Sequence, residues 1–324
     1  GLGKGWMGIL FAVLMIITFG FAYNSVQSNT ICLAWQKAFG IEPATMGIVL
    51  TALTLLIIFG GIQRVAKFSS TVVPVMAVIY LLIAVGVVVW NITSLPKVLL
   101  TIVENAFGFN QAAGGVLGVT VIQGIKRGLF SNEAGEGSAP NAAAVATVSH
   151  PVKQGLIQAL GVFTDTLVVC SCTAFIILVS GVDVTASNGI QLTQDALAHE
   201  IGSIGNPFVA VMIWLFAFSS IIGNYYYGET NVRYIKDSKL GVFIYRLAVA
   251  AMVMIGAVVS LDFAWSFADI TMALLTLCNL VAIVLLSRQA VFLLQDYRQQ
   301  KKEGKNPVFT KSKMPEIADK LEAW

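Results

Sequence analysis

The sequence predicts an all-α integral membrane protein. Of its 324 residues, 57% are hydrophobic and only 11% are charged, and the mean hydropathy is +0.81. A soluble domain carries about 25% charged residues, so this chain has too few charges to cover a surface in contact with water. Long apolar segments recur along it. Helices satisfy their backbone hydrogen bonds internally, so segments of this kind cross a bilayer as helices.

A helix needs roughly 20 mainly apolar residues to cross a bilayer. Seven segments meet this requirement, namely residues 6–26, 45–63, 72–92, 155–180, 207–228, 242–261 and 264–288. A further crossing, 95–125, is interrupted. Its first part, LPKVLLTIVENAF, is long enough for a helix but not for a span, and GFNQAAGGVLG follows before VTVIQGI resumes apolar sequence. This pattern predicts a broken helix with its break near GFNQAAGGVLG.

Lysine and arginine predict the orientation, because they are enriched in cytoplasmic loops. If the N-terminus lies inside, only Lys37 and Lys97 of the 20 basic residues fall in the outer segments. Both chain ends are then cytoplasmic, and 95–125 crosses once. We expect a membrane domain over 1–298 and a basic soluble tail over 299–324. The outer segments in this scheme are 28–44, 93–110, 181–206 and about 262.

Three glycines, Gly114, Gly115 and Gly118, follow the predicted break. Glycine tolerates unwound backbone, which is allowed at membrane depth only inside protein or beside a water-filled cavity. Unwound half-helices offer a positive N-terminus to a carboxylate and carbonyl oxygens to a cation. The alternative is that the three glycines let neighbouring helices pack closely. The sequence leaves both interpretations open.

Aromatic and polar residues meet at the end of the first apolar segment. Phe19, Phe21 and Tyr23 lead into Asn24 and Gln27, and the aromatic rings would wall a small pocket. The alternative is a helix that runs out into the membrane interface, where tyrosine and asparagine are common.

The segment 207–228 carries a second polar group. Its members are Trp214, Ser219, Ser220, Gly223 and Asn224. Two adjacent serine hydroxyls together with carbonyl oxygens would suit a hard cation, which prefers oxygen ligands. The alternative is that each serine bonds back to a carbonyl of its own helix.

Asp165 lies about ten residues into another apolar segment. An ionisable group there is costly, which makes it a functional-site hypothesis, with a structural partner as the alternative. Cys170 and Cys172 are expected to be buried small residues rather than metal ligands, and His199 is placed in an outer loop. We find no Ser-His-Asp set, no P-loop and no HExxH pattern, so the sequence does not support enzymatic chemistry.

Several motifs resemble the alanine/glycine:cation symporter family. They are GFAYNSVQSNTI (20–31), SNEAGEGSAPNAAAVA (131–146), HPVKQGLIQALGVFTDTLVVCSCTAFIIL (150–178), FAFSSIIGNYYYGE (216–229) and the NL of LCNL (277–280). Their order and their extent over the chain before the tail make the resemblance specific. It implies uptake of alanine or glycine driven by sodium, less often by protons, with no other cofactor. It also implies the inverted-repeat fold of five plus five helices of the leucine-transporter type, with helices three to ten present and 95–125 as the broken sixth.

The same resemblance implies roles for individual residues. The SNEAG stretch would form a turn of the inner vestibule. Glu133 and Glu136 would pair with Lys126 and Arg127 as an inner gate, and the alternative is that these charges are solvated in a cytoplasmic loop. Substrate contacts are expected from Phe19, Phe21, Gly114, Gly115, Gly118 and Trp214, ion contacts from Ser219 and Ser220, and gate or vestibule contacts from Asn24, Gln27, Asn132, Glu133, Glu136 and Asp165.

Two departures from the family pattern stand out. Cys278 occupies a position where the family usually has proline, so we expect a straighter last span. Helices one and two of the fold have no counterpart, which makes a partial transporter domain the expectation. The alternative function is a truncated, non-transporting fragment or a partner-dependent subunit of such a carrier.

The expected setting is the plasma membrane of a prokaryote, with the C-terminus cytoplasmic. The partners expected are a small amino acid, sodium and the lipid bilayer, without nucleic acid. Alanine versus glycine, D versus L, and sodium versus proton stay open, as do stoichiometry and oligomeric state.

Overall fold

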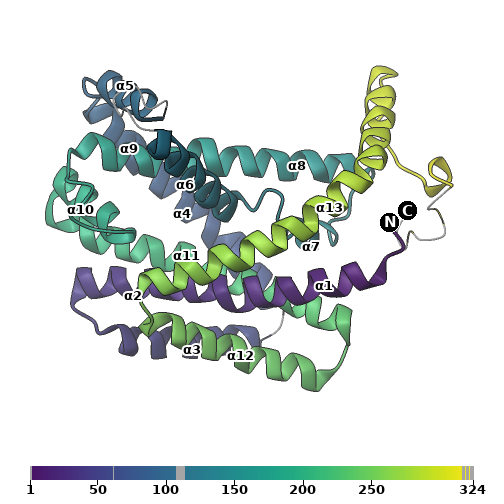
Figure 1. Ribbon diagram of the computed structural model, residues 1–324, viewed down its shortest axis with the longest axis horizontal. Helices are drawn as coiled ribbons and strands as arrows, with labels where there is room; N and C mark the ends of the chain where they lie inside the picture. The colour runs from purple at the N-terminus through teal and green to yellow at the C-terminus, as the bar shows by residue number, and fades with distance from the viewer. Residues whose placement is uncertain (1, 61, 107–113, 316–317, 319–320, 322–324) are drawn as a thin grey trace.

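The computed structural model describes residues 2–60, 62–106, 114–315, 318 and 321, and these residues are helical with connecting turns and no strand. Figure 1 shows the helices running side by side along the long axis. The main helices are α1 (Gly5–Met15), α2 (Asn24–Phe39), α3 (Pro43–Ile58), α4 (Ile62–Trp90), α5 (Leu95–Ala106), α6 (Gly114–Asn132), α7 (Ala139–Ala143), α8 (Pro151–Thr164), α9 (Ser171–Ser180), α10 (Ile190–Ile201), α11 (Gly205–Ile235), α12 (Lys239–Val258) and α13 (Leu261–Lys302).

The described part contains five helical segments long and apolar enough to cross a membrane, or up to six if the bent pair α4–α5 counts as one. The chain is therefore a multi-pass membrane protein. The first and last described parts of the chain lie at the same end of the bundle, and α10 lies at the opposite end (Figure 1). This arrangement is compatible with the prediction that both termini face the same side.

Helix α11 is the centre of the bundle and packs against α1, α2, α4, α10 and α12. Helix α12 packs against α2 and α3, and α13 packs against α1 and α2. Small residues allow the closest approaches. A Cβ on Gly256 of α12 would lie 2.5 Å from the Cα of Ser25, and one on Gly47 of α3 would lie 2.5 Å from the Cβ of Ala257. Close backbone approach of this kind is typical of helix packing in membranes.

Two of the long segments contain π-helical turns. The first, η1 (Ile16–Tyr23), joins α1 to α2 in a continuous helix from Gly5 to Phe39. The second, η2 (Asp165–Cys170), joins α8 to α9 and begins at Asp165. π-Helical turns are rare and are often found at functional sites. Both coincide with stretches that the sequence analysis singled out.

Most of the predicted spans coincide with long helices, but three segments differ. The span predicted over 45–63 is the shorter helix α3, which ends at Ile58. The predicted outer segment 181–206 contains the helix α10, so the prediction that His199 lies in a loop is wrong. This helix is amphipathic and packs on α9 and α11, so hydropathy alone does not reveal it. The predicted break in 95–125 falls mainly at residues 107–113, outside the described residues, and the chain is helical again from Gly114.

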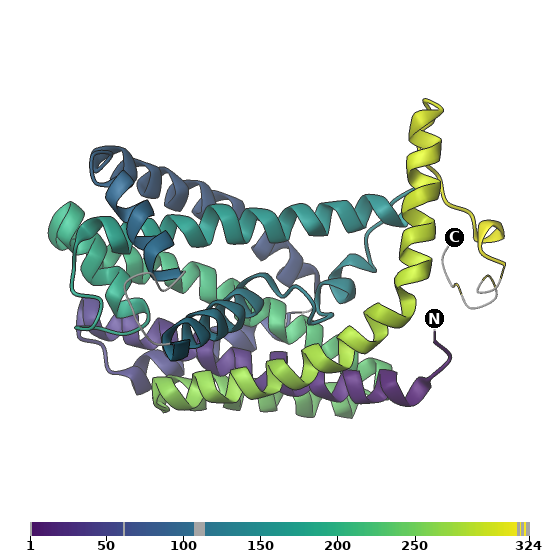
Figure 2. The same ribbon diagram turned by 45° about the horizontal axis from the view of Figure 1, so that its top comes forward.

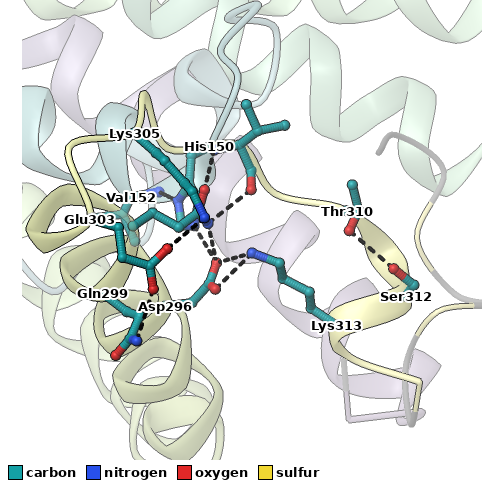
Figure 3. Close-up of polar contacts among 11 residues, drawn as sticks. His150, Val152, Asp296, Gln299, Glu303, Lys305, Thr310, Ser312 and Lys313 are labelled. Atoms are coloured by element: carbon teal, nitrogen blue, oxygen red, sulfur yellow. Dashed lines mark hydrogen bonds and ion pairs between the residues drawn. The ribbon is translucent and has the colours of Figure 1, made fainter.

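The segment predicted as a soluble tail folds back onto the end of α13, which itself continues to Lys302. His150, whose side chain is 0% exposed, accepts the N–H of Val152 at Nδ1 and thereby caps α8. Its Nε2 therefore carries the hydrogen and donates to Asp296 at 3.1 Å (Figure 3). Lys313 reaches the same carboxylate at 2.7 Å. Asp296 thus joins α13, the start of α8 and the tail.

Backbone contacts reinforce this junction, which we call the tail clasp (residues 305–313 with His150 and Asp296). Phe309 is buried, packs its ring edge-on to His150 and donates its N–H to the carbonyl of Ser149. Lys153 bonds to Asn306 at 2.6 Å. Figure 2 shows the last part of α13 turning away from the bundle axis, beside the start of α8 and the returning tail.

Candidate functional site

A polar chamber lies between the first helix, the end of α6 and α11. Its volume is about 320 Å³, at the lower end of the size of small-molecule sites. It brings together three predicted site residues, Gln27, Glu133 and Ser220. The full lining consists of Tyr23, Gln27, Phe130, Ser131, Glu133, Ser220, Gly223, Asn224 and Tyr227.

Two asparagines join the helices at the wall of this chamber. The amide of Asn224 on α11 donates to the Oδ1 of Asn24 at 3.2 Å, and both side chains are buried. The Asn24 amide in turn donates to the carbonyl of Gly20, within the π-helical turn. The predicted gate residue Asn24 therefore holds the first helix against α11.

A second cavity, of about 450 Å³, lies on the other side of the SNEAG turn and shares Ser131, Glu133 and Tyr227 with the chamber. Asn132 and Asp165, two predicted vestibule residues, line it. Each has a polar partner across the α6–η2 contact: Asn132 donates to Thr166 at 2.8 Å, and Asp165 accepts from Ser131 at 2.6 Å. Asp165 thus has the structural partner that the sequence left as its alternative.

The turn that separates the two cavities, residues 133–138, has an unusual backbone. Glu133 has φ +55°, and it is the one non-glycine residue with positive φ among the described residues. Gly135 and Gly137 follow with φ of +94° and +84°. Glu133 accepts the hydroxyl of Ser138 at 2.5 Å, and Asn279 of α13 donates to the carbonyl of Gly135. Left-handed backbone outside glycine is uncommon and often marks functional turns.

Glu136 lies at the centre of this turn and is 0% exposed. One carboxyl oxygen accepts the hydroxyl of Tyr23 at 2.7 Å, and the other has no hydrogen-bond partner among the described residues. Burial raises the pKa of Glu136 to about 8, against the lowering effect of the Tyr23 hydrogen bond. Burial also raises the pKa of Glu133.

The predicted pairing of these two glutamates with Lys126 and Arg127 is wrong. Both basic side chains pair with Asp269 instead, and Arg127 also lies over the ring of Trp265. The structure places Asp269 on α13 beside the second half of α6, where its carboxylate neutralises both cations. Lys126 and Arg127 therefore lie against the bundle, so they do not act as loop charges in the orientation count.

The predicted aromatic substrate contacts do not share one face. Phe19 is 0% exposed and packs against Tyr23 and Tyr227, in the core beside α13. Phe21 points the other way, towards Tyr245 of α12. Trp214 stacks on Phe218 with centroids 5.4 Å apart, and its indole N–H is buried without a partner in the described part of the chain. None of the three predicted residues lines the chamber.

Ser219 and Ser220 both donate to the carbonyl oxygen of Phe216, at 2.8 and 3.1 Å. This is the local bonding that the sequence left as the alternative to an ion site. Only Ser220 lines the chamber. Gly114, Gly115 and Gly118 lie in the first turns of α6 and are helical rather than unwound.

Three lining residues were not predicted from the sequence, namely Phe130, Ser131 and Tyr227. Ser131 and Tyr227 lie inside the family motifs SNEAGEG and GNYYYGE, and Phe130 directly precedes the first of them. The sequence does not show that these residues lie beside Gln27 and Ser220, because the chamber forms between helices that are far apart in sequence.

Comparison with known proteins identifies the family. The model of the sodium:alanine symporter family matches residues 1–311. The chain is 54% identical over 312 residues to the probable sodium/glutamine symporter GlnT of Bacillus subtilis, an alignment that covers 96% of this chain and 65% of that protein. It is 52% identical to the amino-acid carrier protein AlsT of the same organism, covering 100% and 69%.

A more distant relative is the sodium/alanine symporter AgcS of Methanococcus maripaludis, at 35% identity over 94% of this chain and 68% of that protein. The chain thus spans about two thirds of the length of these curated relatives, and slightly less of the first. The family match covers nearly every described residue, including all those that line the chamber. The chain therefore belongs to the sodium:alanine symporter family, a family of transporters and not of enzymes.

Proposed function

We propose that this chain is part of a secondary transporter that imports a small neutral amino acid together with sodium. The observation that carries the proposal is the polar chamber, which joins the first helix, the SNEAG turn and α11 at residues of three family motifs. The names of its relatives support sodium as the coupling ion: one is named a probable sodium/glutamine symporter and another a sodium/alanine symporter. Another, from Bacillus sp. PS3, is a sodium/proton-dependent alanine carrier.

The chamber suits an amino acid chemically. Gln27 and Asn224 carry amides that donate hydrogen bonds to a carboxylate and accept them from an ammonium group. Tyr23 and Phe130, 4.6 Å apart between ring centroids, provide an apolar wall for a side chain. Alanine, glycine and glutamine all fall within this class. One methyl group changes binding by only about 1–3 kcal/mol, so the proposal names the class of small neutral amino acids and no single member.

Sodium is assigned to Ser219 and Ser220. Each hydroxyl uses its hydrogen in the bond to Phe216, which leaves the oxygen lone pairs available to a cation. Ser220 shares the chamber with the proposed amino-acid site. Bound sodium would then favour the same conformation that binds the amino acid, and such shared preference is what couples two ligands.

The fuller architecture is part of the same proposal. The helices would correspond to helices three to ten of an inverted-repeat transporter, with α5 and α6 as the two halves of the broken sixth. Trp214, whose buried indole N–H has no partner among the described residues, and the first turn of α6 do not line the chamber, so they would contact the substrate in another conformation of the carrier. The protein would lie in the plasma membrane of a prokaryote with its C-terminus cytoplasmic.

The test is uptake of labelled alanine, glycine and glutamine into proteoliposomes that contain this chain. GlnT of Bacillus subtilis, reconstituted in parallel, is the positive control. Uptake that rises with an inward sodium gradient and stops when the gradient is dissipated supports the proposal. If GlnT transports while this chain does not, the chain is instead the non-transporting fragment or subunit named as its alternative. Uptake that is equal with sodium and with choline contradicts sodium coupling.

A further inference from the structure

Glu136 is a buried acid without a basic partner. Its side chain is fully buried, and no lysine, arginine or histidine nitrogen of the described chain lies within 4 Å of it. Lys126 and Arg127, the cations expected from the sequence to pair with it, both pair with Asp269. An isolated buried carboxylate is costly, and such a group binds a proton instead of staying charged.

Among the groups around Glu136, only the hydroxyl of Tyr23 favours its charged form, and the described residues place no cation beside it. Within the same turn Glu133 is a second carboxyl, whose pKa is raised as well. The first helix contributes Tyr23, and α11 contributes Tyr227, which lies between the turn's two cavities. The side chains of α1 and α13 nearest to the glycines of the turn are uncharged: Phe11 and Asn279 lie against Gly137, and Thr276 and Leu280 lie against Gly135. The charged residue of α13 near Tyr23 is Asp269, a third carboxyl group.

The two oxygens of the Glu136 carboxyl are not equivalent. Oε1 accepts the hydroxyl hydrogen of Tyr23, which links the turn to the first helix. Oε2 is buried and has no hydrogen-bond partner in the part of the chain that the structure describes, so it is the oxygen free to carry a proton. We propose that Glu136 is a proton-binding site: it is neutral while the turn 133–138 packs against Tyr23, and it releases its proton to water when the turn moves away.

This step breaks the O–H bond of a carboxylic acid, leaves a carboxylate, and transfers the proton to water on the side that the turn opens to. Acidity therefore favours the packed turn. The packed state has a pKa of about 8 and a water-exposed glutamate an ordinary value of 4.5, so the preference weakens as pH rises between these values. Because the inference rests on the proposed transport function, it makes the turn a site where a proton accompanies the conformational change of the carrier.

The first test reads the proton directly, without transport. Infrared pH-difference spectra of the purified protein in lipid should show a carboxylic-acid C=O band that titrates near pH 8. The band should be lost in Glu136→Gln and kept in Glu42→Gln, a control at an exposed glutamate. Tyr23→Phe removes the hydrogen bond that stabilises the carboxylate, so it should move the band to higher pH. This variant also keeps the test open if Glu136→Gln does not fold.

A wild-type band that survives in Glu136→Gln, or a Glu136 band that titrates near 4.5, would overturn the assignment. The second test uses proteoliposomes loaded with a pH-sensitive dye. In the wild type, amino-acid uptake should change the internal pH, whereas Glu136→Gln should retain sodium-driven uptake with a proton-to-amino-acid ratio near zero. Wild-type uptake without proton movement would overturn the role in transport. Absence of wild-type uptake would instead refute the transport function, while the infrared band still decides whether Glu136 binds a proton.

Discussion

Ser219 and Ser220 illustrate how one side chain can fit two interpretations. Both hydroxyls bond to the carbonyl of Phe216 within their own helix, as serines in helices commonly do. That bond uses only the hydrogen, so it does not exclude a cation on the oxygen. The difference between the two serines is position, because only Ser220 borders the chamber.

The double variant Ser219→Ala with Ser220→Ala should raise the sodium concentration needed for half-maximal uptake by about 10- to 30-fold. The estimate assigns each lost contact about 1 kcal/mol. Sodium dependence of uptake in proteoliposomes is the measurement. Ser287→Ala is a matched control, since Ser287 makes the same local bond on the exposed part of α13. A sodium dependence that does not change in the double variant removes the serines from the ion site.

Gly137 carries two constraints at once. Its φ is +84°, and a Cβ there would lie 2.7 Å from Asn279 and 2.9 Å from Phe11. Gly137→Ala should therefore lower the stability of the protein by about 1–3 kcal/mol, seen as a lower unfolding temperature in detergent. Gly124 lies in α6, and no atom of the described residues lies within 4 Å of a Cβ placed there. Gly124→Ala should therefore leave the stability of the protein unchanged or raise it by up to about 1 kcal/mol. Equal unfolding temperatures for the two variants would show that the turn tolerates a side chain.

At the scale of elements, the tail clasp connects α8, α13 and the tail, although hydropathy predicts each of them as a separate segment. Asp296 accepts bonds from His150, Lys313 and Gln300, and so joins the start of α8, the tail and α13. The basic and polar composition of residues 299–324 predicts a soluble tail. Composition does not report that Phe309 is buried against His150.

Asp296→Ala should release the tail. Losing hydrogen bonds from charged partners costs about 1.5–3 kcal/mol, so trypsin should cut after Lys305 and Lys311 at least about tenfold faster, provided that cleavage follows opening. Asp237→Ala is the control, because that side chain is exposed and pairs only with the exposed Arg233 among the described residues. Equal cleavage rates in the two variants would show that the clasp does not hold the tail.

The hydropathy pattern predicted some helices of this protein but not others. The long apolar helices α11 and α12 were predictable, because their length and hydropathy are properties of consecutive residues. The helix α10 and the π-helical turns were not. An amphipathic helix such as α10 has too few consecutive apolar residues to stand out by hydropathy. A π-helical turn depends on the packing around it, and no repeat in the sequence marks it.

At the scale of the whole molecule, both described ends of the chain lie at one end of the bundle (Figure 1). The positive-inside count predicts that this end is cytoplasmic. The prediction still favours that orientation without Lys126 and Arg127, because the remaining basic residues keep the same asymmetry: of the other 18, two fall outside and 16 inside.

Single cysteines can decide the orientation. In a background where the four native cysteines are replaced by alanine, Asn306→Cys should react with an impermeant maleimide only after the cells are permeabilised. Asp183→Cys, on the exposed turn after α9, should react in intact cells. The two sites control for each other, because both are exposed in the structure. The opposite labelling pattern would place the C-terminus outside.

The sequence by itself determined the membrane class, most spans and the family, because these follow from composition, from runs of consecutive apolar residues and from motif order. Only the tertiary structure decided which polar groups meet. Tyr23 and Glu136 are 113 residues apart, and Asn24 and Asn224 are 200 apart. The pairing of Lys126 and Arg127 with Asp269 likewise spans more than 140 residues. Such contacts depend on how helices pack against one another, and the spacing of residues within one helix carries no information about the partner on another.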